Sequence, residues 1–283
     1  MGNRYFEVLK RASSFLDDQG VEGQSILFVF LARKQWSKTD WLIHLNDEMT
    51  KVEQQQLDAD LALLAKHYPA QYILGYADFY EQRFLVNEHT LIPRPETEEL
   101  VELCLSENSD EPLTVADIGT GTGAIAISLK KNRPNWHVLA VDISAETLKV
   151  AEENAERLNA AIDFYQGDLL APLNETKVDL LISNPPYISN DEWQLMDESV
   201  RTFEPKAALF AEHDGLAIYQ RLAQEATQVL APKGKIYLEI GFQQGAAVKK
   251  LFQQAFPKYI VRVLKDLSGN DRMVAVTPNE KMG

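Results

Sequence analysis

The sequence predicts an α/β fold, with a mostly parallel seven-stranded sheet whose last strand is antiparallel, plus a small N-terminal helical domain and a hairpin linker. From Leu113 onward, short apolar runs alternate with helical segments, which is typical of a parallel sheet wrapped by helices. The last two runs are separated only by residues 266–271, a connection too short for a parallel crossover, so these two strands must be antiparallel. Before residue 75, apolar residues recur at helical spacing. We therefore expect a helical domain over residues 1–75, a linker over 76–92 and a sheet domain over 93–283.

Length, charge and cysteine content restrict the classes of function. A chain of 283 residues with 45% hydrophobic content can bury a full core and has room for one large and one small domain. The formal net charge of −14 repels phosphates, so stable nucleic acid binding is not expected. The only cysteine, Cys104, excludes an internal disulfide and any multi-cysteine metal site, and no metal is expected. The N-terminus lacks a signal-peptide pattern, and the most apolar run, Ile26 to Ala32, is too short to cross a bilayer, so we expect a cytoplasmic protein without membrane association.

Local patterns define the N-terminal helices and the linker. Between Tyr5 and Leu74 the apolar spacing is helical, and no run of strict alternation appears. The stretch from Tyr76 to Leu91 changes to a strand-like pattern broken by polar turns, and Pro93-Arg94-Pro95 then ends it. We expect a hairpin there, followed by an acidic helix after Glu96.

The seven strands of the sheet are expected at the apolar runs that follow this helix. They are Thr114 to Ile118, His137 to Val141, Ile162 to Gln166, Val178 to Ser183, Lys235 to Ile240, Ile260 to Lys265 and Arg272 to Thr277. Five parallel strands closed by a reversed hairpin are the arrangement of the Rossmann-like class I methyltransferases. A dinucleotide dehydrogenase would continue with parallel crossovers.

The turn after the first strand is rich in glycine and leads into the helical segment Ala124 to Lys131. Glycines allow a sharp turn and let backbone amides approach a ligand closely. Gly121 and Gly123 are two positions apart, whereas the dinucleotide fingerprint places its third glycine three positions after the second, so the spacing favours S-adenosyl-L-methionine over NAD. Taken alone, the loop is also compatible with a tight structural turn.

Two acidic positions at strand ends are candidate contacts to a nucleoside. Asp142 ends the second strand, where a carboxylate can accept both ribose hydroxyl protons, although a turn residue before a helix cap at Ser144 is an alternative role. After the third strand, Asp168 can accept from an adenine amino group while Leu169 packs on the ring, although an exposed loop aspartate is equally compatible. The candidate cofactor-binding residues are Asp117, Gly119, Thr120, Gly121, Thr122, Gly123, Asp142, Asp168, Leu169 and Asn184.

The loop after the fourth strand, Asn184-Pro185-Pro186-Tyr187, carries the strongest signal for chemistry. It lies at the carboxyl edge of the sheet, where open α/β sheets bind ligands. Two prolines stiffen the backbone and remove its donors, so carbonyl acceptors remain for a planar substrate NH2 group, and the Asn184 side chain adds another. Tyr187 offers a flat face for stacking. The candidate catalytic residues are Asn184, Pro185 and Tyr187, and the candidate substrate-binding residues are these three with Pro186.

Three functions are compatible with this loop. A methyltransferase acting on an amide nitrogen is favoured, because holding both NH2 protons helps the nitrogen to become pyramidal in the transition state. An adenine amino methyltransferase on DNA or RNA presents the same planar NH2 group, but the acidic charge and the absence of an obvious target-recognition domain oppose it. A non-catalytic cofactor-binding protein would be expected to lose Asn184 or the glycines, and both are intact.

Along nearly its whole length the chain resembles the peptide chain release factor glutamine methyltransferases. The resemblance rests on five segments, Gln71 to Gly75, Leu91 to Glu98, Gly119 to Gly123, Asn184 to Tyr187 and Phe203 to Pro205. The Asn-Pro-Pro-Tyr motif is shared with adenine-specific DNA methyltransferases, whereas the Pro-Arg-Pro-Glu-Thr stretch is much more specific.

The resemblance implies that S-adenosyl-L-methionine is held by Gly119 to Gly123, Asp142 and the Asp168-Leu169 turn, and that Asn184 to Tyr187 hold the glutamine of a Gly-Gly-Gln loop. It also implies class I peptide chain release factors as partners, docked with the help of the helical N-terminal domain. Leu169 differs from some relatives, in which an aromatic residue occurs. Three residues of the specific stretch fit either a helix start or a site role, namely Arg94, Thr97 and Glu98.

Overall fold

The structure, a computed structural model, describes residues 3–173 and 175–279 of the chain. Its contacts divide the chain into two compact units. The first comprises Met1–Tyr76 with Met196–Phe203, and the second comprises Ala77–Leu195 with Glu204–Gly283. The sequence did not indicate that residues 196–203 would associate with the N-terminal helices.

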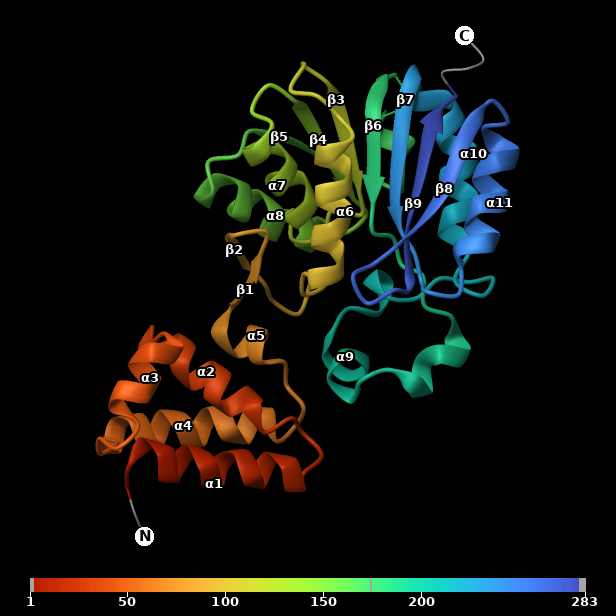
Figure 1. Ribbon diagram of the computed structural model, residues 1–283. Helices are drawn as coiled ribbons and strands as arrows, with labels where there is room; N and C mark the ends of the chain where they lie inside the picture. Colours follow the sequence, from red (N-terminus) through yellow and green to blue (C-terminus); the bar gives the residue numbers. More distant parts are fainter. Residues whose placement is uncertain (1–2, 174, 280–283) are drawn as a thin grey trace. The chain divides into compact units, whose positions relative to one another are not determined.

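The first unit is helical, and the helices of residues 5–74 lie together in it (Figure 1). Its helices are α1 (Tyr5–Asp18), α2 (Gln24–Lys34), α3 (Lys38–His44), α4 (Lys51–Leu64), α5 (Ala70–Leu74) and α9 (Glu198–Phe203). Capping boxes begin α3 at Ser37 and α4 at Thr50, where each hydroxyl accepts from a backbone N–H three residues on. In the segment that joins from later in the chain, the Phe203 ring meets Tyr68 edge-on at 5.0 Å between centroids.

The second unit contains a seven-stranded sheet of order β5-β4-β3-β6-β7-β9-β8 (Figure 1). The strands are β3 (Thr114–Ile118), β4 (His137–Asp142), β5 (Ile162–Gln166), β6 (Val178–Ser183), β7 (Leu230–Glu239), β8 (Tyr259–Lys265) and β9 (Asp271–Pro278). Strands β3 to β7 pair in parallel, and β9 is antiparallel to both β7 and β8. The predicted fold class is therefore confirmed.

Strand β7 begins five residues earlier than the sequence indicates, whereas β8 and β9 begin only one residue earlier. We expected β7 to begin at Lys235, and the preceding Pro232 and Gly234 are residues typical of turns. In the structure β7 begins at Leu230, which already pairs with Val178 of β6, and the register shifts before the next pair. The irregularity accommodates the residues that are unfavourable inside a regular strand.

Helices cover both faces of the sheet. The buried side chains of α6 (Pro95–Ser106), α7 (Ala124–Asn132) and Ala155 of α8 (Ala145–Arg157) form one core cluster with one face, and α10 (Ala217–Val229) and α11 (Gly245–Ala255) form a second cluster with the other. Along β4, successive side chains alternate between the two clusters, as the two-residue period of a strand requires. Short 3-10 helices occur at Ala171–Leu173, Asn190–Leu195 and Lys206–Ala208.

The expected hairpin is formed by β1 (Tyr76–Phe79) and β2 (Gln82–Leu85). Phe79 and Phe84 are buried in the cluster that contains α6 and α7. The Asn154 side chain of α8 joins this hairpin to the glycine loop, because it accepts from the Leu85 amide at 2.7 Å and donates to the Leu85 and Thr122 carbonyls at 3.1 and 3.0 Å. The hairpin is thus a fixed wall beside the sheet edge where the site forms.

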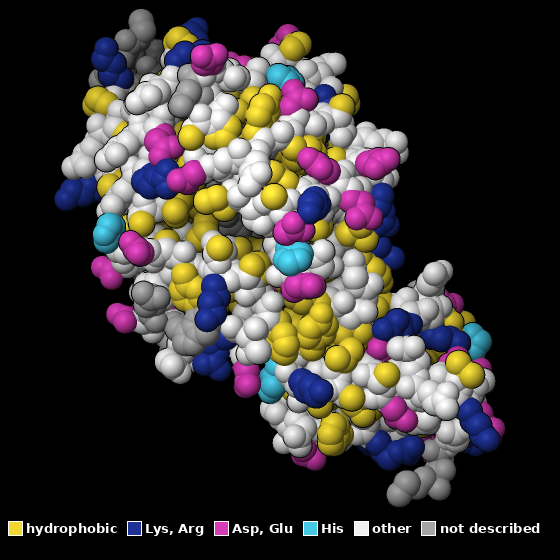
Figure 2. Space-filling view, turned by 180° about the vertical axis from the view of Figure 1, so that it is seen from behind, with side chains coloured by type: hydrophobic (Ala, Val, Ile, Leu, Met, Phe, Trp, Pro, Cys, Tyr) yellow, Lys and Arg dark blue, Asp and Glu magenta, His cyan; other side chains and the backbone are white. Residues whose placement is uncertain are grey.

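The surface mixes charges of both signs. On the face drawn in Figure 2, Lys and Arg side chains are interspersed with Asp and Glu. In the parts of the chain that the structure describes, no helix combines the length and apolar character needed to cross a bilayer.

Cys104 should be chemically silent in the folded protein. Its side chain in α6 is fully buried, and burial raises the pKa of the thiol to about 12. Since the thiolate is the reactive form, a chromogenic disulfide reagent at pH 8 should label Cys104 only after unfolding. Rapid stoichiometric labelling of the native protein would contradict this packing.

Candidate functional site

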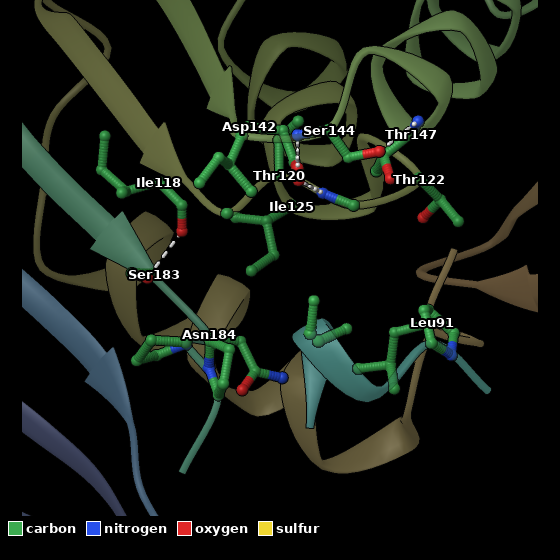
Figure 3. Close-up of a pocket in the computed structure, with 18 of the residues that line it drawn as sticks. Leu91, Ile118, Thr120, Thr122, Ile125, Asp142, Ser144, Thr147, Ser183 and Asn184 are labelled. Carbon is green, nitrogen blue, oxygen red and sulfur yellow. Dashed lines mark hydrogen bonds between the residues drawn. The ribbon is translucent and has the colours of Figure 1, made fainter. Parts of the chain in front are cut away.

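A cavity of about 530 Å³ opens in the second unit at the carboxyl ends of β3, β4 and β6. The strand order reverses at β3, because β4 pairs on one side of it and β6, which follows later in the chain, pairs on the other. Such a switch point is where open α/β sheets bind ligands. Figure 3 shows Asp142 and Ser144 on one side of the cavity and Asn184 across from them.

The glycine loop forms one wall of the cavity. Gly119, Gly121 and Gly123 have φ angles of 73°, 57° and 80°, a region that side-chain-bearing residues rarely adopt. The amides of Gly119 and Thr120 donate to the Val141 carbonyl at 2.8 and 3.0 Å, which fixes the loop against β4. Gly119, Thr120, Gly121 and Thr122 line the cavity, whereas Gly123 is the N-cap residue before α7, and the Ile127 side chain lies about 3.0 Å from where a Cβ on Gly123 would be.

Asp142 lies at the cavity edge at the end of β4. One carboxylate oxygen accepts from the Gly121 amide and the other from the Ser144 amide, each at 3.0 Å. Burial raises the pKa of this carboxyl, and the backbone donors oppose the rise. Because each carboxylate oxygen has two acceptor positions, Asp142 organises the turn and still has acceptor capacity for a ligand. The two roles considered from the sequence are therefore compatible.

Asp117 lies behind the glycine loop and does not line the cavity. Its side chain is fully buried, and its Oδ2 accepts from the Thr120 hydroxyl at 2.7 Å and from the Ala126 amide at 3.2 Å. The other oxygen, Oδ1, is buried without a hydrogen-bond partner in the described chain. Burial raises the pKa of this carboxyl to about 7. This position allows Asp117 to hold the loop together from inside the core.

Asp168 and Leu169 both line the cavity beyond β5. The Asp168 carboxylate forms an ion pair with Arg221 of α10 at 3.0 Å, in an exposed position. Leu169 has a φ angle of 49°, which turns the chain sharply after Asp168. The ion pair still leaves acceptor positions free on the Asp168 carboxylate.

The corner, the segment Asn184 to Tyr187 after β6, provides the wall of the cavity opposite the glycine loop. The Ser183 hydroxyl, at the end of β6, donates to the Ile118 carbonyl of β3 at 2.6 Å, which ties this corner to the strand that carries the glycine loop (Figure 3). Asn184, Pro185 and Pro186 line the cavity. The Asn184 amide nitrogen donates to the Thr97 hydroxyl at 3.1 Å, and no described residue donates to its Oδ1, which is not a buried atom. The corner therefore offers an unused oxygen acceptor.

Tyr187 lies apart from the cavity lining. Its ring packs against the core cluster of α10 and α11, its hydroxyl lies 3.4 Å from Glu239 Oε1, and burial raises the pKa of the phenol. Its carbonyl accepts from Gln244 at 2.9 Å, and a Cβ at Gly215 would lie 2.0 Å from it. Tyr187 therefore anchors the end of the corner, and its predicted stacking role remains a prediction.

From the sequence, the residues of the Pro-Arg-Pro-Glu-Thr stretch fit either a helix start or a site role. In the structure they have definite hydrogen-bond and ion-pair partners. Arg94 forms an ion pair with the buried Glu204 carboxylate at 2.5 Å, which also accepts from the Ile92 amide at 3.1 Å. The Glu98 carboxylate accepts from the Tyr80 amide at 3.0 Å. Arg94 and Thr97 line the cavity, and α6 begins at Pro95, slightly before the expected start after Glu96. One sequence signal pointed to these contacts: Glu204 lies in Phe203 to Pro205, one of the five segments on which the family resemblance rests.

Two family models and several known proteins are similar to the chain. The methyltransferase small domain family matches residues 97–215, and the PrmC N-terminal domain family matches residues 7–75. The release factor glutamine methyltransferase of Enterococcus faecalis is 62% identical over 96% of this chain and 99% of its own length. That of Streptococcus pneumoniae is 50% identical over 91% of this chain and 92% of its own. The chain belongs to the release factor glutamine methyltransferase family.

Solved structures agree with the fold of this family member. A methyltransferase from Pyrococcus furiosus is 19% identical, with a TM-score of 0.53 over 81% of this chain and 98% of its own. The 16S rRNA N2 G1207 methyltransferase of T. thermophilus, solved with AdoMet and guanosine, is 14% identical, with a TM-score of 0.50 over 72% of this chain and 50% of its own. At such identities the likeness concerns the fold alone.

The buried Asp117 carboxyl should make stability fall with rising pH. Its pKa is raised from an ordinary 3.8 to about 7, so between these values the folded chain holds a proton that the unfolded chain releases. The free energy of unfolding therefore decreases as pH rises through this window. Asp117→Asn has no titrating group and keeps the shape and hydrogen-bonding pattern of the protonated acid, so its free energy of unfolding should depend less on pH. Urea unfolding between pH 4 and 7 measures both slopes, and equal slopes would contradict the assignment.

Proposed function

We propose that the chain transfers the methyl group of S-adenosyl-L-methionine to the side-chain amide nitrogen of the glutamine in the Gly-Gly-Gln loop of class I peptide chain release factors. The single observation that carries this proposal is the unused Asn184 oxygen, set in a proline-stiffened corner across the cavity from the glycine loop. Membership of the release factor glutamine methyltransferase family supports the choice of substrate.

The cavity lining fits a nucleoside cofactor. Gly119 and Gly121 leave their surroundings open where a Cβ would lie, so a ligand can approach the backbone there. The Asp142 carboxylate has acceptor capacity for ribose hydroxyls, and the Asp168 carboxylate can accept from an adenine amino group while Leu169 covers the ring. When bound, S-adenosyl-L-methionine supplies a reactive methyl group on its sulfonium sulfur.

The corner positions the substrate nitrogen. Asn184 Oδ1 accepts one proton of the glutamine NH2 group, and the main-chain carbonyl of Pro185 accepts the other, since the two prolines have no N–H to compete. An amide lone pair is delocalised into its carbonyl, so binding both protons favours the pyramidal geometry of the transition state. Alignment of the nitrogen with the methyl group then lowers the barrier by proximity. The glutamine nitrogen gives up one of its two protons to solvent as the new N–C bond replaces the C–S bond of the bound cofactor.

We assign docking of the release factor to the N-terminal helical domain. Phe6, Phe15 and Phe28 of this unit are exposed, although large aromatic side chains are usually buried. The match of residues 7–75 to the PrmC N-terminal domain family supports a specialised role for the unit. Exposed aromatic side chains are candidates for docking contacts, because aromatic residues are enriched at protein interfaces.

Mass spectrometry tests the proposed reaction. After incubation with labelled S-adenosyl-L-methionine, a class I release factor should carry one methyl group on the glutamine of its Gly-Gly-Gln loop. A release factor with glutamate at that position is the matched control, because it lacks the NH2 group and should remain unmodified. Methyl transfer to an adenine-containing oligonucleotide, with none to the release factor, would contradict the proposal.

Two substitutions should separate catalysis from cofactor binding. Asn184→Ala removes the substrate acceptor and should lower kcat by about 10²- to 10³-fold while calorimetric affinity for S-adenosyl-L-methionine persists. Asp142→Ala should mainly weaken cofactor affinity, by roughly tenfold to a hundredfold, because it removes a charged acceptor. Loss of cofactor affinity in the first variant, or unchanged affinity in the second, would argue against this division of roles.

A further inference from the structure

We propose that Glu239 and Thr97 form a hydrogen-bond relay that fixes the direction of the Asn184 side-chain amide, so that its oxygen, and not its NH2 group, faces the substrate. The inference rests on the proposed function, because the direction of this amide matters only if its oxygen binds a substrate proton. In this account Thr97 and Glu239 are positioning residues that act through Asn184.

Three elements bring the relay together. Thr97 lies in the first turn of α6, Glu239 ends β7, and Asn184 follows β6. The Thr97 hydroxyl lies 2.6 Å from Glu239 Oε2, and the Asn184 amide nitrogen lies 3.1 Å from the Thr97 hydroxyl oxygen. Thr97 and Glu239 are 5% and 2% exposed, so water cannot readily replace either partner.

The chemistry of these groups fixes the direction of the relay. An ionised carboxylate only accepts, so Thr97 must donate its single hydroxyl proton to Glu239. The Thr97 oxygen is then an acceptor, and only the NH2 end of the Asn184 amide can satisfy it. A reversed amide would place its oxygen against the Thr97 oxygen with no proton between them. Asn184 Oδ1 is therefore turned away from Thr97 and is open to the cavity that Asn184 lines.

The relay requires an ionised Glu239, so its direction depends on pH. The groups that face Glu239 are Thr97 and Glu96 from α6, Tyr187 from the corner, Tyr219 from α10 and Arg272 from β9. Burial raises the pKa of Glu239 to about 7, whereas the Thr97 hydrogen bond and the Arg272 charge lower it. Below this pH a protonated Glu239 can donate to the Thr97 oxygen. The Thr97 hydroxyl can then donate to the Asn184 oxygen, so that this oxygen turns toward Thr97 and away from the cavity. The kcat should therefore fall as pH decreases through about 7.

Substitutions at Thr97 test the relay. Thr97→Val keeps the shape and removes the hydroxyl, so kcat should fall about tenfold to a hundredfold while calorimetric cofactor affinity is retained. Thr97→Ser keeps the hydroxyl and should restore most of the kcat. The matched control is Tyr219→Phe, which removes a buried hydroxyl that donates to the Glu239 main-chain carbonyl at 2.7 Å but leaves the relay intact. Its kcat should stay near that of the unsubstituted enzyme, and thermal melting checks that each variant is folded.

A reversal of the relay gives a second test that does not depend on loss of function. In Asn184→Asp, the new carboxylate and Glu239 both require the single Thr97 proton, so kcat should fall sharply. Adding Glu239→Gln supplies an NH2 group that can donate to Thr97, which then donates to the carboxylate at position 184. In the double variant every hydrogen bond of the relay is made in the reversed direction. Its kcat should therefore be at least about five times that of Asn184→Asp alone.

The outcomes separate this inference from the proposed function. If the unsubstituted enzyme does not methylate a release factor, the proposed function is wrong and the relay has no substrate to serve. If it does, but folded Thr97→Val keeps its kcat, or Thr97→Ser is as impaired as Thr97→Val, the relay is overturned. An effect of Tyr219→Phe as large as that of Thr97→Val, or a double variant no better than Asn184→Asp, would also overturn it.

Discussion

The pairing of β3 with β6 decides where the site forms. These strands are far apart in the sequence, yet they lie side by side in parallel, with Asp117 opposite Ile182 in the register. Parallel pairing brings their carboxyl ends to the same edge of the sheet, so the glycine loop and the proline-stiffened corner emerge next to each other. The Ser183 hydroxyl then joins the two strand ends through the Ile118 carbonyl at 2.6 Å. The two walls of the cavity therefore share one rigid base.

Rigidity around this base comes from buried polar groups that are far apart in the chain. Asp117 fixes the glycine loop from inside the core. Glu204 forms an ion pair with Arg94, the residue just before α6. Glu239 accepts from the Thr97 hydroxyl beside the corner. Buried carboxylates are costly unless hydrogen-bonded, so such residues restrict the fold to arrangements that satisfy them. Each of the three stiffens a segment that lines the cavity, which favours a site formed before its ligands arrive.

Much of the fold could be predicted from the sequence because it depends on local patterns. Buried parallel strands appear as short apolar runs, and the short connection of residues 266–271 requires the antiparallel end of the sheet. Contacts between distant residues gave no such signal. Thr97 and Glu239 are 142 positions apart, and only the tertiary structure shows that they bond. The sequence also grouped Asp117 with the cofactor residues, since the first strand leads into the glycine loop, but its side chain is buried behind that loop.

In the proposed mechanism the Asn184 oxygen faces the substrate nitrogen, because the Thr97 hydroxyl accepts a hydrogen bond from the NH2 end of the same amide. Neutron diffraction from crystals of the enzyme with S-adenosylhomocysteine and a Gly-Gly-Gln peptide measures this directly, because it distinguishes nitrogen from oxygen and locates protons. We predict that Asn184 Oδ1 lies about 3 Å from the glutamine nitrogen, with the Thr97 proton directed at Glu239. An Asn184 amide in the opposite orientation, or a glutamine bound away from this corner, would contradict the account.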